Sequence, residues 1–220
     1  MEHPPFGAVI VGAGQMGAAL AERFDAINTT ALVLTREHCL PTNSGAAVTI
    51  DASKLFAIPL DVPVFLAIPL SAIEMLPAEA LTGRVVVDVA NYWPRLDAST
   101  RFADSPRDSS LVVQSLFPGA RVVKTLNHLS FADLTFDSRP RHAHYRRGQC
   151  VAGDDAVARL AIARIVDALG FTPIDAGPLA NGRLFGPGTQ IFNGGWRTCE
   201  QLVRILRRRT DYPVAAFDLG

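Results

Sequence analysis

The segment Ala8–Leu20, AVIVGAGQMGAAL, constrains the fold of this chain more than any other. A short apolar run stops at Gly12, two further glycines follow at Gly14 and Gly17, and a helical pattern begins at once. G-x-G-x-x-G between a strand and a helix is the context in which this motif binds a dinucleotide. The first glycine permits a tight turn, the second lets the pyrophosphate approach the backbone, and the third lets helix and strand pack closely. We therefore expect a dinucleotide-binding turn rather than a simple packing turn.

Apolar, β-branched-rich runs recur along the chain and predict the strands. Because the runs are continuous rather than alternating, they suit a sheet covered on both faces. They are Ala8–Val11, Ala31–Leu34, Val62–Ala67, Val85–Val89, Arg121–Thr125, Gln149–Ala152 and Thr172–Ile174. Helical patterns lie between several of them. The sequence thus predicts an α/β fold with a doubly wound, mostly parallel sheet of the Rossmann-like NAD(P)-binding class.

The C-terminal part of the chain has a different composition. A helical pattern ends at Gly170, and its apolar residues recur at helical spacing: Val157, Leu160, Ala161, Ile165 and Ala168. A Gly- and Pro-rich stretch then leads to a last helix over about 196–209. We expect residues 1–178 to form the Rossmann-like NADP-binding domain. Residues 179–220 form a small C-terminal helical appendage, a loop and helix that pack back on it as one compact unit.

Composition argues against several classes of partner. The formal net charge is +0, which disfavours nucleic acid or a membrane surface, and no apolar run approaches the ~20 residues of a membrane span. The N-terminus is polar and leads straight into a strand, so no signal peptide is expected. The three cysteines are scattered, and His142 and His144 lack a third ligand. We expect a cytoplasmic protein with no metal, no nucleic acid and no membrane partner.

The end of the second predicted strand bears on the choice of cofactor. An NAD site usually places Asp or Glu there for the ribose 2′-hydroxyl, whereas a 2′-phosphate calls for a cation and a hydroxyl. Here the strand is followed by Thr35 and Arg36, a short donor and a planar guanidinium. These residues favour NADP(H), although Glu37 is an alternative partner for a ribose.

Three later strand ends carry further candidates, because open α/β sheets bind ligands at the carboxyl ends of their strands. Asn91 and Asn127 suit the nicotinamide ribose or carboxamide, and each is equally able to cap a following helix. The predicted cofactor-binding residues are Gly12, Ala13, Gly14, Gln15, Met16, Gly17, Thr35, Arg36, Ile68, Pro69, Ala90, Asn91 and Asn127.

His128 is the candidate catalytic residue. It follows a predicted strand end and is able to donate a hydrogen bond to an acceptor carbonyl or ring nitrogen as negative charge develops there. The alternative is a loop histidine satisfied by the backbone. The chain carries no G-x-S-x-G, H-E-x-x-H or CxxC motif, so hydrolase and metalloenzyme interpretations have little support.

Taken in order, these motifs resemble the family of NADPH-dependent reductases of the deazaflavin coenzyme F420, also called F420-dependent NADP oxidoreductases. The matching pieces are VIVGAGQMGAALA, LTR, FLAIP, VVVDVANYWP, VVKTLNH, VAGDD and GFTPIDAGPLANGRL. The chain departs from the family at Gly186, where an acidic residue often precedes the proline, and at Tyr92-Trp93, where a simpler proline turn is common. The resemblance implies a Rossmann-like NADP domain, a homodimer, and hydride exchange between NADPH and F420 as co-substrate.

We therefore expect an NADP-dependent oxidoreductase that uses a flat, small-molecule redox acceptor, most simply F420. Alternatives are an NADPH-dependent reductase of another flavin, an imine or a small molecule, and a non-catalytic NADP-binding sensor. The tail of F420 carries a phosphate and glutamates, which the arginines of the basic loop 139–147 are able to attract; a solvated loop is the simpler interpretation. The acceptor, the direction of the reaction and the oligomeric state stay open.

Overall fold

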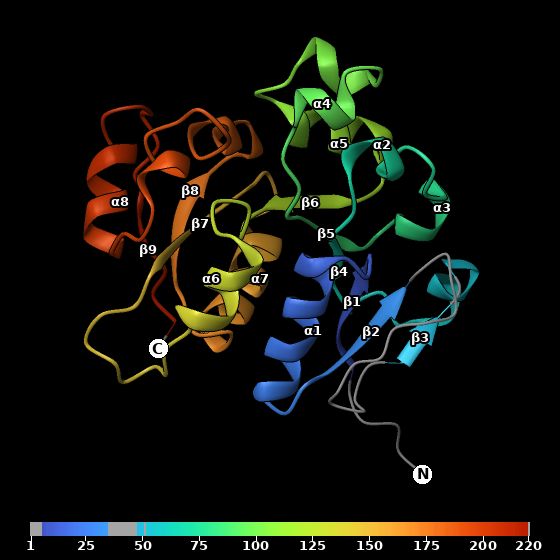
Figure 1. The fold of residues 1–220 in the computed structure, drawn as a ribbon, viewed down its shortest axis with the longest axis horizontal. Helices are drawn as coiled ribbons and strands as arrows, with labels where there is room; N and C mark the ends of the chain where they lie inside the picture. The colour runs from blue at the N-terminus through green and yellow to red at the C-terminus, as the bar shows by residue number, and fades with distance from the viewer. Residues whose placement is uncertain (1–5, 35–47, 51, 220) are drawn as a thin grey trace.

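The computed structural model describes residues 6–34, 48–50 and 52–219 of the chain. Within these residues the strands form one sheet in the order β3-β2-β1-β4-β5-β6-β7-β8-β9. Neighbouring strands are parallel except for the antiparallel pairs β6–β7 and β8–β9. In Figure 1 the sheet runs from β3 at one end of the molecule to β9 at the other. The strands are β1 (Phe6–Val11), β2 (Thr30–Leu34), β3 (Val48–Ile50), β4 (Val64–Leu66), β5 (Val85–Asp88), β6 (Arg121–Lys124), β7 (Gly148–Gly153), β8 (Thr172–Gly177) and β9 (Ala215–Ala216).

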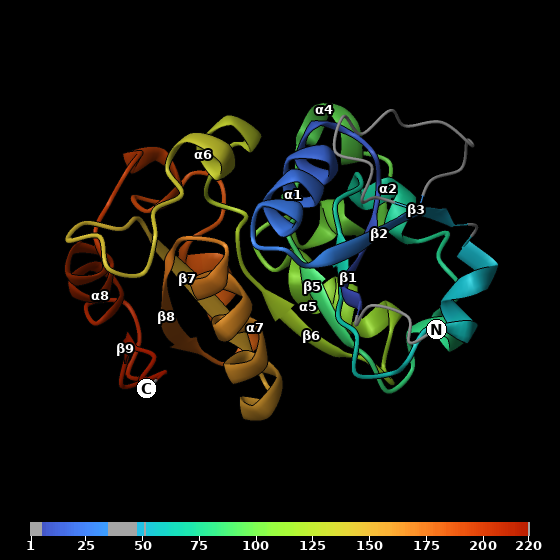
Figure 2. The same cartoon turned by 90° about the horizontal axis from the view of Figure 1, so that it is seen from below.

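Helices cover both faces of this sheet. The α-helices are α1 (Gln15–Ala26), α2 (Leu70–Ile73), α3 (Ala78–Leu81), α4 (Pro94–Asp97), α5 (Ser109–Leu116), α6 (Phe131–Phe136), α7 (Ala156–Ala168) and α8 (Cys199–Leu206). Short 3-10 turns are η1 (Ala52–Ala57), η2 (Arg101–Asp104), η3 (Leu179–Leu184) and η4 (Phe192–Gly194). One apolar core joins α1, α6 and α7 to one face, and a second joins α2, α3 and α5 to the other. Figure 2, seen from below, shows α1 and α7 on the same side of the strands.

Continuous apolar strands account for this double covering. In β1, Ala8 and Ile10 enter the first core while Val9 enters the second, and all three are 0% exposed. Successive side chains of a strand point to opposite faces, so an uninterrupted apolar run can be stable only if both faces are buried. The predicted fold class is confirmed, and each of the predicted runs contains a strand. The short strands β3 and β9 are additional to the prediction.

The predicted helix is present as α7, but its buried face is not the one that its regularly spaced apolar residues indicate. Val157 is 72% exposed, and the buried face instead carries two charged residues, Arg159 and Asp167. Arg159 Nε lies 3.0 Å from Asp175 Oδ1 on β8, and Asp167 forms an ion pair with Arg146. Because these carboxylates pair the arginines inside the protein, hydropathy alone misplaces the face.

The segment that follows β8 packs on the last strands of the sheet. α8 contacts β7 and β8, and a third apolar core joins Leu202 and Leu206 of α8 to Cys150 of β7 and Ile174 of β8. β9 pairs with β8, so the C-terminal appendage adds a strand as well as a helix. The helix α8 itself is shorter than expected. The division at residue 178 stays a prediction. No helix in the described ranges has the length and apolar character needed to cross a membrane.

Candidate dinucleotide and acceptor site

The glycine turn between β1 and α1 has the geometry that a dinucleotide requires. Gly12 has φ +113°, and a Cβ there would lie 2.4 Å from the carbonyl oxygen of Ala67. A Cβ on Gly17 would lie 2.0 Å from the carbonyl oxygen of Gly12. Gly14 differs, since a Cβ there would meet no atom of the described residues within 4 Å. Two of the glycines thus permit close packing, and the third leaves open space beside the backbone.

The first turn of α1 suits an anion. Gly14 is the N-cap and provides no side-chain cap, and the first turn contains no acidic residue. The first N–H groups of a helix lack intrahelical partners, and the helix dipole favours negative charge beside them. The residues present therefore fit the pyrophosphate of a dinucleotide, as they do in other glycine-turn sites.

A cavity of about 770 Å³ opens beside this turn. It gathers residues from the start of α1 and from the ends of β4, β5 and β6, as expected for ligand sites of open sheets. The predicted residues that line it are Gly14, Gln15, Met16, Ile68, Pro69, Ala90, Asn91, Asn127 and His128. Gly12, Ala13 and Gly17 are not among the lining residues; the two glycines form the packed turn, and Ala13 packs against the first core. Thr35 and Arg36 lie outside the described residues.

Asn91 and Asn127 form a reciprocal pair across two strand ends. Asn91 Nδ2 donates to the carbonyl of Asn127 at 2.7 Å, and Asn127 Nδ2 donates to Asn91 Oδ1 at 3.0 Å. Neither residue caps the following helix, because the N-caps of α4 and α6 are Trp93 and Ser130. Asn127 Oδ1 is buried and has no partner among the described residues. The pair fixes the cavity wall, and its role toward a nicotinamide stays a prediction.

A buried ion pair supports this wall, and the sequence analysis missed it. Lys124 Nζ lies 3.0 Å from Asp88 Oδ2, with side chains 3% and 0% exposed. Ser110 donates to the same carboxylate oxygen at 2.7 Å, and the Ala90 N–H donates to Asp88 Oδ1 at 2.9 Å. Lys124 also donates to the carbonyl of Ala90. The pair therefore anchors the backbone at the end of β5. The sequence does contain a sign of this pair, since a charged residue ends each of two apolar strands.

Leu126 sets the direction of the chain after β6. It is fully buried and has φ +56°, a left-handed conformation that is uncommon for a bulky side chain. Such backbone strain persists only where the surroundings enforce it, and it is concentrated at functional sites. The turn at Leu126 precedes the two cavity residues Asn127 and His128.

His128 is buried, and the backbone satisfies one of its ring nitrogens. The N–H of Cys150 donates to His128 Nε2 at 3.0 Å. Burial, followed by the neighbouring charge of Arg147, lowers the pKa of His128 to about 3. The imidazole is therefore neutral near pH 7 and has no proton to release from Nε2. The alternative of a histidine satisfied by the backbone therefore holds for Nε2. The ring proton of the neutral imidazole is on Nδ1.

Arg147 belongs to the basic loop but points inward. Its side chain is 4% exposed, donates to the carbonyl of His128 at 3.0 Å and pairs with Asp137 at 2.7 Å and Asp133 at 3.1 Å. Burial acts to raise the pKa of Asp133, but hydrogen bonds from Ser130 and the charge of Arg147 lower it overall. Both Arg147 and Asp133 line the cavity, and the sequence analysis did not place them there.

The remaining arginines of the basic loop also have partners. Arg141 and Arg146 both pair with Asp167, and Arg139 donates to the carbonyls of Phe136 and Ser138. The loop therefore carries much less free positive charge than its sequence suggests. It gives the expected contact with an anionic tail little support.

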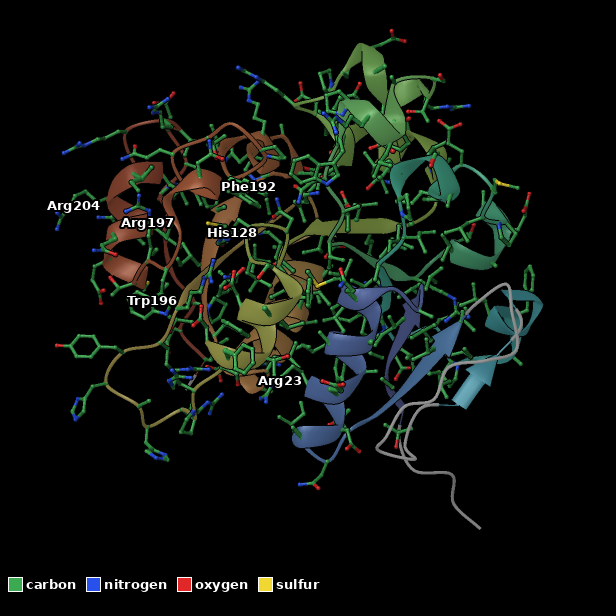
Figure 3. All side chains as sticks on the ribbon, viewed as in Figure 1. Arg23, His128, Phe192, Trp196, Arg197 and Arg204 are labelled. Atoms are coloured by element: carbon green, nitrogen blue, oxygen red, sulfur yellow. The ribbon has the colours of Figure 1, made fainter. Side chains whose placement is uncertain are left out.

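Aromatic residues form another part of the cavity wall. Trp93, before α4, and Phe192, in η4, meet edge to face with ring centroids 5.9 Å apart, and both line the cavity with Phe131. Figure 3 shows Phe192 close to His128 in projection, although the two are 64 positions apart in the sequence (192 − 128). Phe185 packs against the imidazole, with centroids 5.7 Å apart. The cavity thus combines an anion-binding turn with an aromatic wall suited to a flat ring.

Comparison with known proteins agrees with this architecture. Residues 8–92 match the family described as NADP oxidoreductase coenzyme F420-dependent. A hypothetical protein of Sinorhizobium meliloti, SMa0349, is 29% identical, with a TM-score of 0.68 over 88% of this chain and 93% of that one. A structure from Arthrobacter sp. FB24, named as an F420-dependent NADP-reductase, is 21% identical, with a TM-score of 0.64 over 81% and 88%.

A curated relative shares a shorter segment. The metalloreductase STEAP3 of Rattus norvegicus is 32% identical over 106 residues, which are 48% of this chain and 20% of that protein. The chain therefore spans about a fifth of that relative's length. An imine reductase from Aspergillus terreus, solved with NADPH4, shares the fold at 17% identity, with a TM-score of 0.56 over 82% of this chain and 58% of that one. The resemblance drawn from the motifs is confirmed over residues 8–92, which match the F420-dependent NADP oxidoreductase family, and the chain has a Rossmann-like NAD(P)-binding fold.

Proposed function

We propose that this protein transfers a hydride between NADPH and a flat organic acceptor, with coenzyme F420 as the first acceptor to consider. The observation that carries the proposal is the single cavity that joins the glycine turn at Gly14 to the aromatic wall of Trp93 and Phe192. Hydride transfer requires two rings to be held with their reacting atoms about 3–3.5 Å apart. A cavity with an anion-binding end and an aromatic end meets that requirement.

The titratable groups of the cavity also suit this chemistry. Asp97 accepts the N–H of Trp93, Asp133 pairs with Arg147, and His128 is held neutral. Each has a structural partner, although Asp97 Oδ1 is buried with none among the described residues. Hydride transfer does not depend on a nucleophile–base pair because the cofactors carry the chemistry. Bound NADPH supplies the hydride, and the protein supplies binding, orientation and exclusion of water.

The roles of individual residues follow from their positions. The N–H groups beyond Gly14 bind the pyrophosphate, and Asn91 with Asn127 orients the nicotinamide end. Trp93 and Phe192 cover the ring site and limit the access of water. Donation of a hydrogen bond to the acceptor from His128 would use Nδ1–H, with His128 acting as a neutral donor rather than as a source of a proton.

The first experiment is steady-state absorbance with NADPH and purified F420, run beside FMN and FAD. We expect oxidation of NADPH with F420 alone. Binding of NADPH without reaction toward any of these acceptors, with turnover of an imine, would favour the imine-reductase alternative. Binding without turnover of any acceptor would favour the sensor.

Arg36→Ala tests the choice of nucleotide. The guanidinium is expected to bind the 2′-phosphate, and a charge-assisted hydrogen bond of this kind contributes about 1.5–3 kcal/mol. The variant should therefore weaken NADPH binding by about tenfold or more and leave NADH binding nearly unchanged, as measured by fluorescence titration. An equal loss for both nucleotides would contradict the 2′-phosphate assignment.

A further inference from the structure

A group of unpaired arginines lies beside α8, away from the glycine turn. Arg197, Arg204, Arg208 and Arg209 line a cleft of about 320 Å³ with Gln190, Gln201 and Ile205, and we call it the arginine cleft. Its lining contains no acidic residue. Figure 3 shows Arg197 and Arg204 at α8, on the outer edge of the molecule.

Several arginines elsewhere in the described chain have a partner for their charge or for their N–H groups. Arg146, Arg147 and Arg159 each pair with a carboxylate, and Arg84 donates to backbone carbonyls. Within the ranges that the structure describes, no carboxylate lies within ion-pair distance of any arginine in the cleft. Arg197 Nε is in addition buried with no hydrogen-bond partner. A guanidinium stays charged at all relevant pH values, so four of them grouped without a counter-charge repel one another, and an anion bound among them would relieve that repulsion.

The structure of α8 does not by itself account for the group. Arg204 lies in the last turn, where a cation stabilises the helix dipole. Arg197, however, precedes the N-cap Thr198, at the end where a cation is unfavourable. Its guanidinium instead covers Gly194, where an added Cβ would lie 2.1 Å from Arg197 Nη2. Arg197 therefore lines the cleft without stabilising the helix dipole.

One short segment of the chain, residues 190–197, contributes to both the arginine cleft and the aromatic end of the main cavity. Phe192 and Gly195 line the cavity, whereas Gln190 and Arg197 line the cleft. Gly195 has φ +66°, and no described atom lies within 4 Å of a Cβ added there. A ligand whose flat ring lies against Trp93 and Phe192 would reach the arginines by extending a chain along this segment.

We propose that the arginine cleft binds a group with two or more negative charges, a phosphate or clustered carboxylates. Arginine suits such groups because its planar fork forms paired hydrogen bonds with their oxygens. The charged group is the tail of the redox acceptor, an assignment that rests on the proposed function; a free anion of the same chemistry is the other source. The cleft takes the place that the sequence analysis gave to the basic loop.

The double variant Arg204→Glu/Arg208→Glu tests the proposal, and Arg164→Glu on α7 is the matched control. All three arginines are exposed, and α7 and α8 cover opposite faces of the sheet. We expect the double variant to raise the KM for F420 by about tenfold or more with little change in kcat, since each lost charged hydrogen bond costs about that factor. The KM for the same deazaflavin ring without its phosphate and glutamates should stay unchanged, as should both values in the control.

Calorimetric titration with inorganic phosphate and with triglutamate provides a readout independent of turnover. Binding of either probe to the wild type that is lost in the double variant supports an anion site in the cleft even if no acceptor reacts. Failure of the proposed function is therefore distinguishable from failure of the anion-site proposal. Binding with an unchanged KM for F420 identifies a free anion as the ligand. No binding of either probe together with an unchanged KM would overturn the proposal, and so would an equal effect of Arg164→Glu.

Discussion

The neutral state of His128 leads to a quantitative prediction about stability and pH. Burial and the charge of Arg147 lower the pKa of His128 from 6.5 to about 3 in the folded protein. The unfolded chain binds a proton near pH 6.5 and the folded chain does not, so this contribution to stability is complete above pH 6.5 and is lost as the pH falls toward 3. One pKa unit corresponds to about 1.4 kcal/mol. Between pH 8 and pH 5.5 the folded state should therefore lose about 1.4 kcal/mol through this histidine.

Urea unfolding at the two pH values measures the loss, with His128→Gln as the comparison. The amide oxygen of glutamine is able to accept the N–H of Cys150 but does not titrate. The variant should therefore be somewhat less stable than the wild type at pH 8, but its free energy of unfolding should not show the further decrease between pH 8 and pH 5.5 that this histidine causes. Asp133, whose pKa is lowered, loses its contribution only below about pH 4, outside this window. An equal pH dependence of the free energy of unfolding in both proteins would refute the reasoning. So would an NMR titration of the His128 imidazole itself near pH 6.5 in the folded wild type.

Two glycine variants and one ion-pair variant extend these tests. Gly14→Ala should leave unfolding nearly unchanged but weaken NADPH binding by tenfold or so, because its Cβ enters open space beside the turn. Gly17→Ala should lower both the stability and the affinity for NADPH, with a stability loss of about 1–3 kcal/mol from the clash with the Gly12 carbonyl. Urea unfolding measures the stability and fluorescence titration measures the affinity. Identical behaviour of the two variants would contradict the different roles assigned to Gly14 and Gly17. Asp88→Asn leaves Lys124 without its carboxylate and should cost about 3–5 kcal/mol. Adding Lys124→Met should recover part of that loss, and simple additivity of the two changes would argue against direct pairing.

Local sequence patterns determined the chain's sheet and its nucleotide turn. Continuous apolar runs can be stable only between two helical layers, and the fixed offsets of Gly12, Gly14 and Gly17 relate neighbours along the chain. Both kinds of signal act over a few residues. They predicted the fold class and placed residues such as Asn91 and Asn127 at the same edge of the sheet, and the structure brings these two together.

Tertiary structure decided which polar groups are paired and which are free. Arg159 and Asp167 face inward on α7 because their partners come from other elements. The basic loop is largely neutralised by carboxylates that no local pattern reveals, while the four arginines of the arginine cleft have no carboxylate partner among the described residues. Burial and ion pairing depend on residues distant in sequence. A run of charged residues therefore has the same local sequence pattern whether its charges are paired within the protein or available to a ligand.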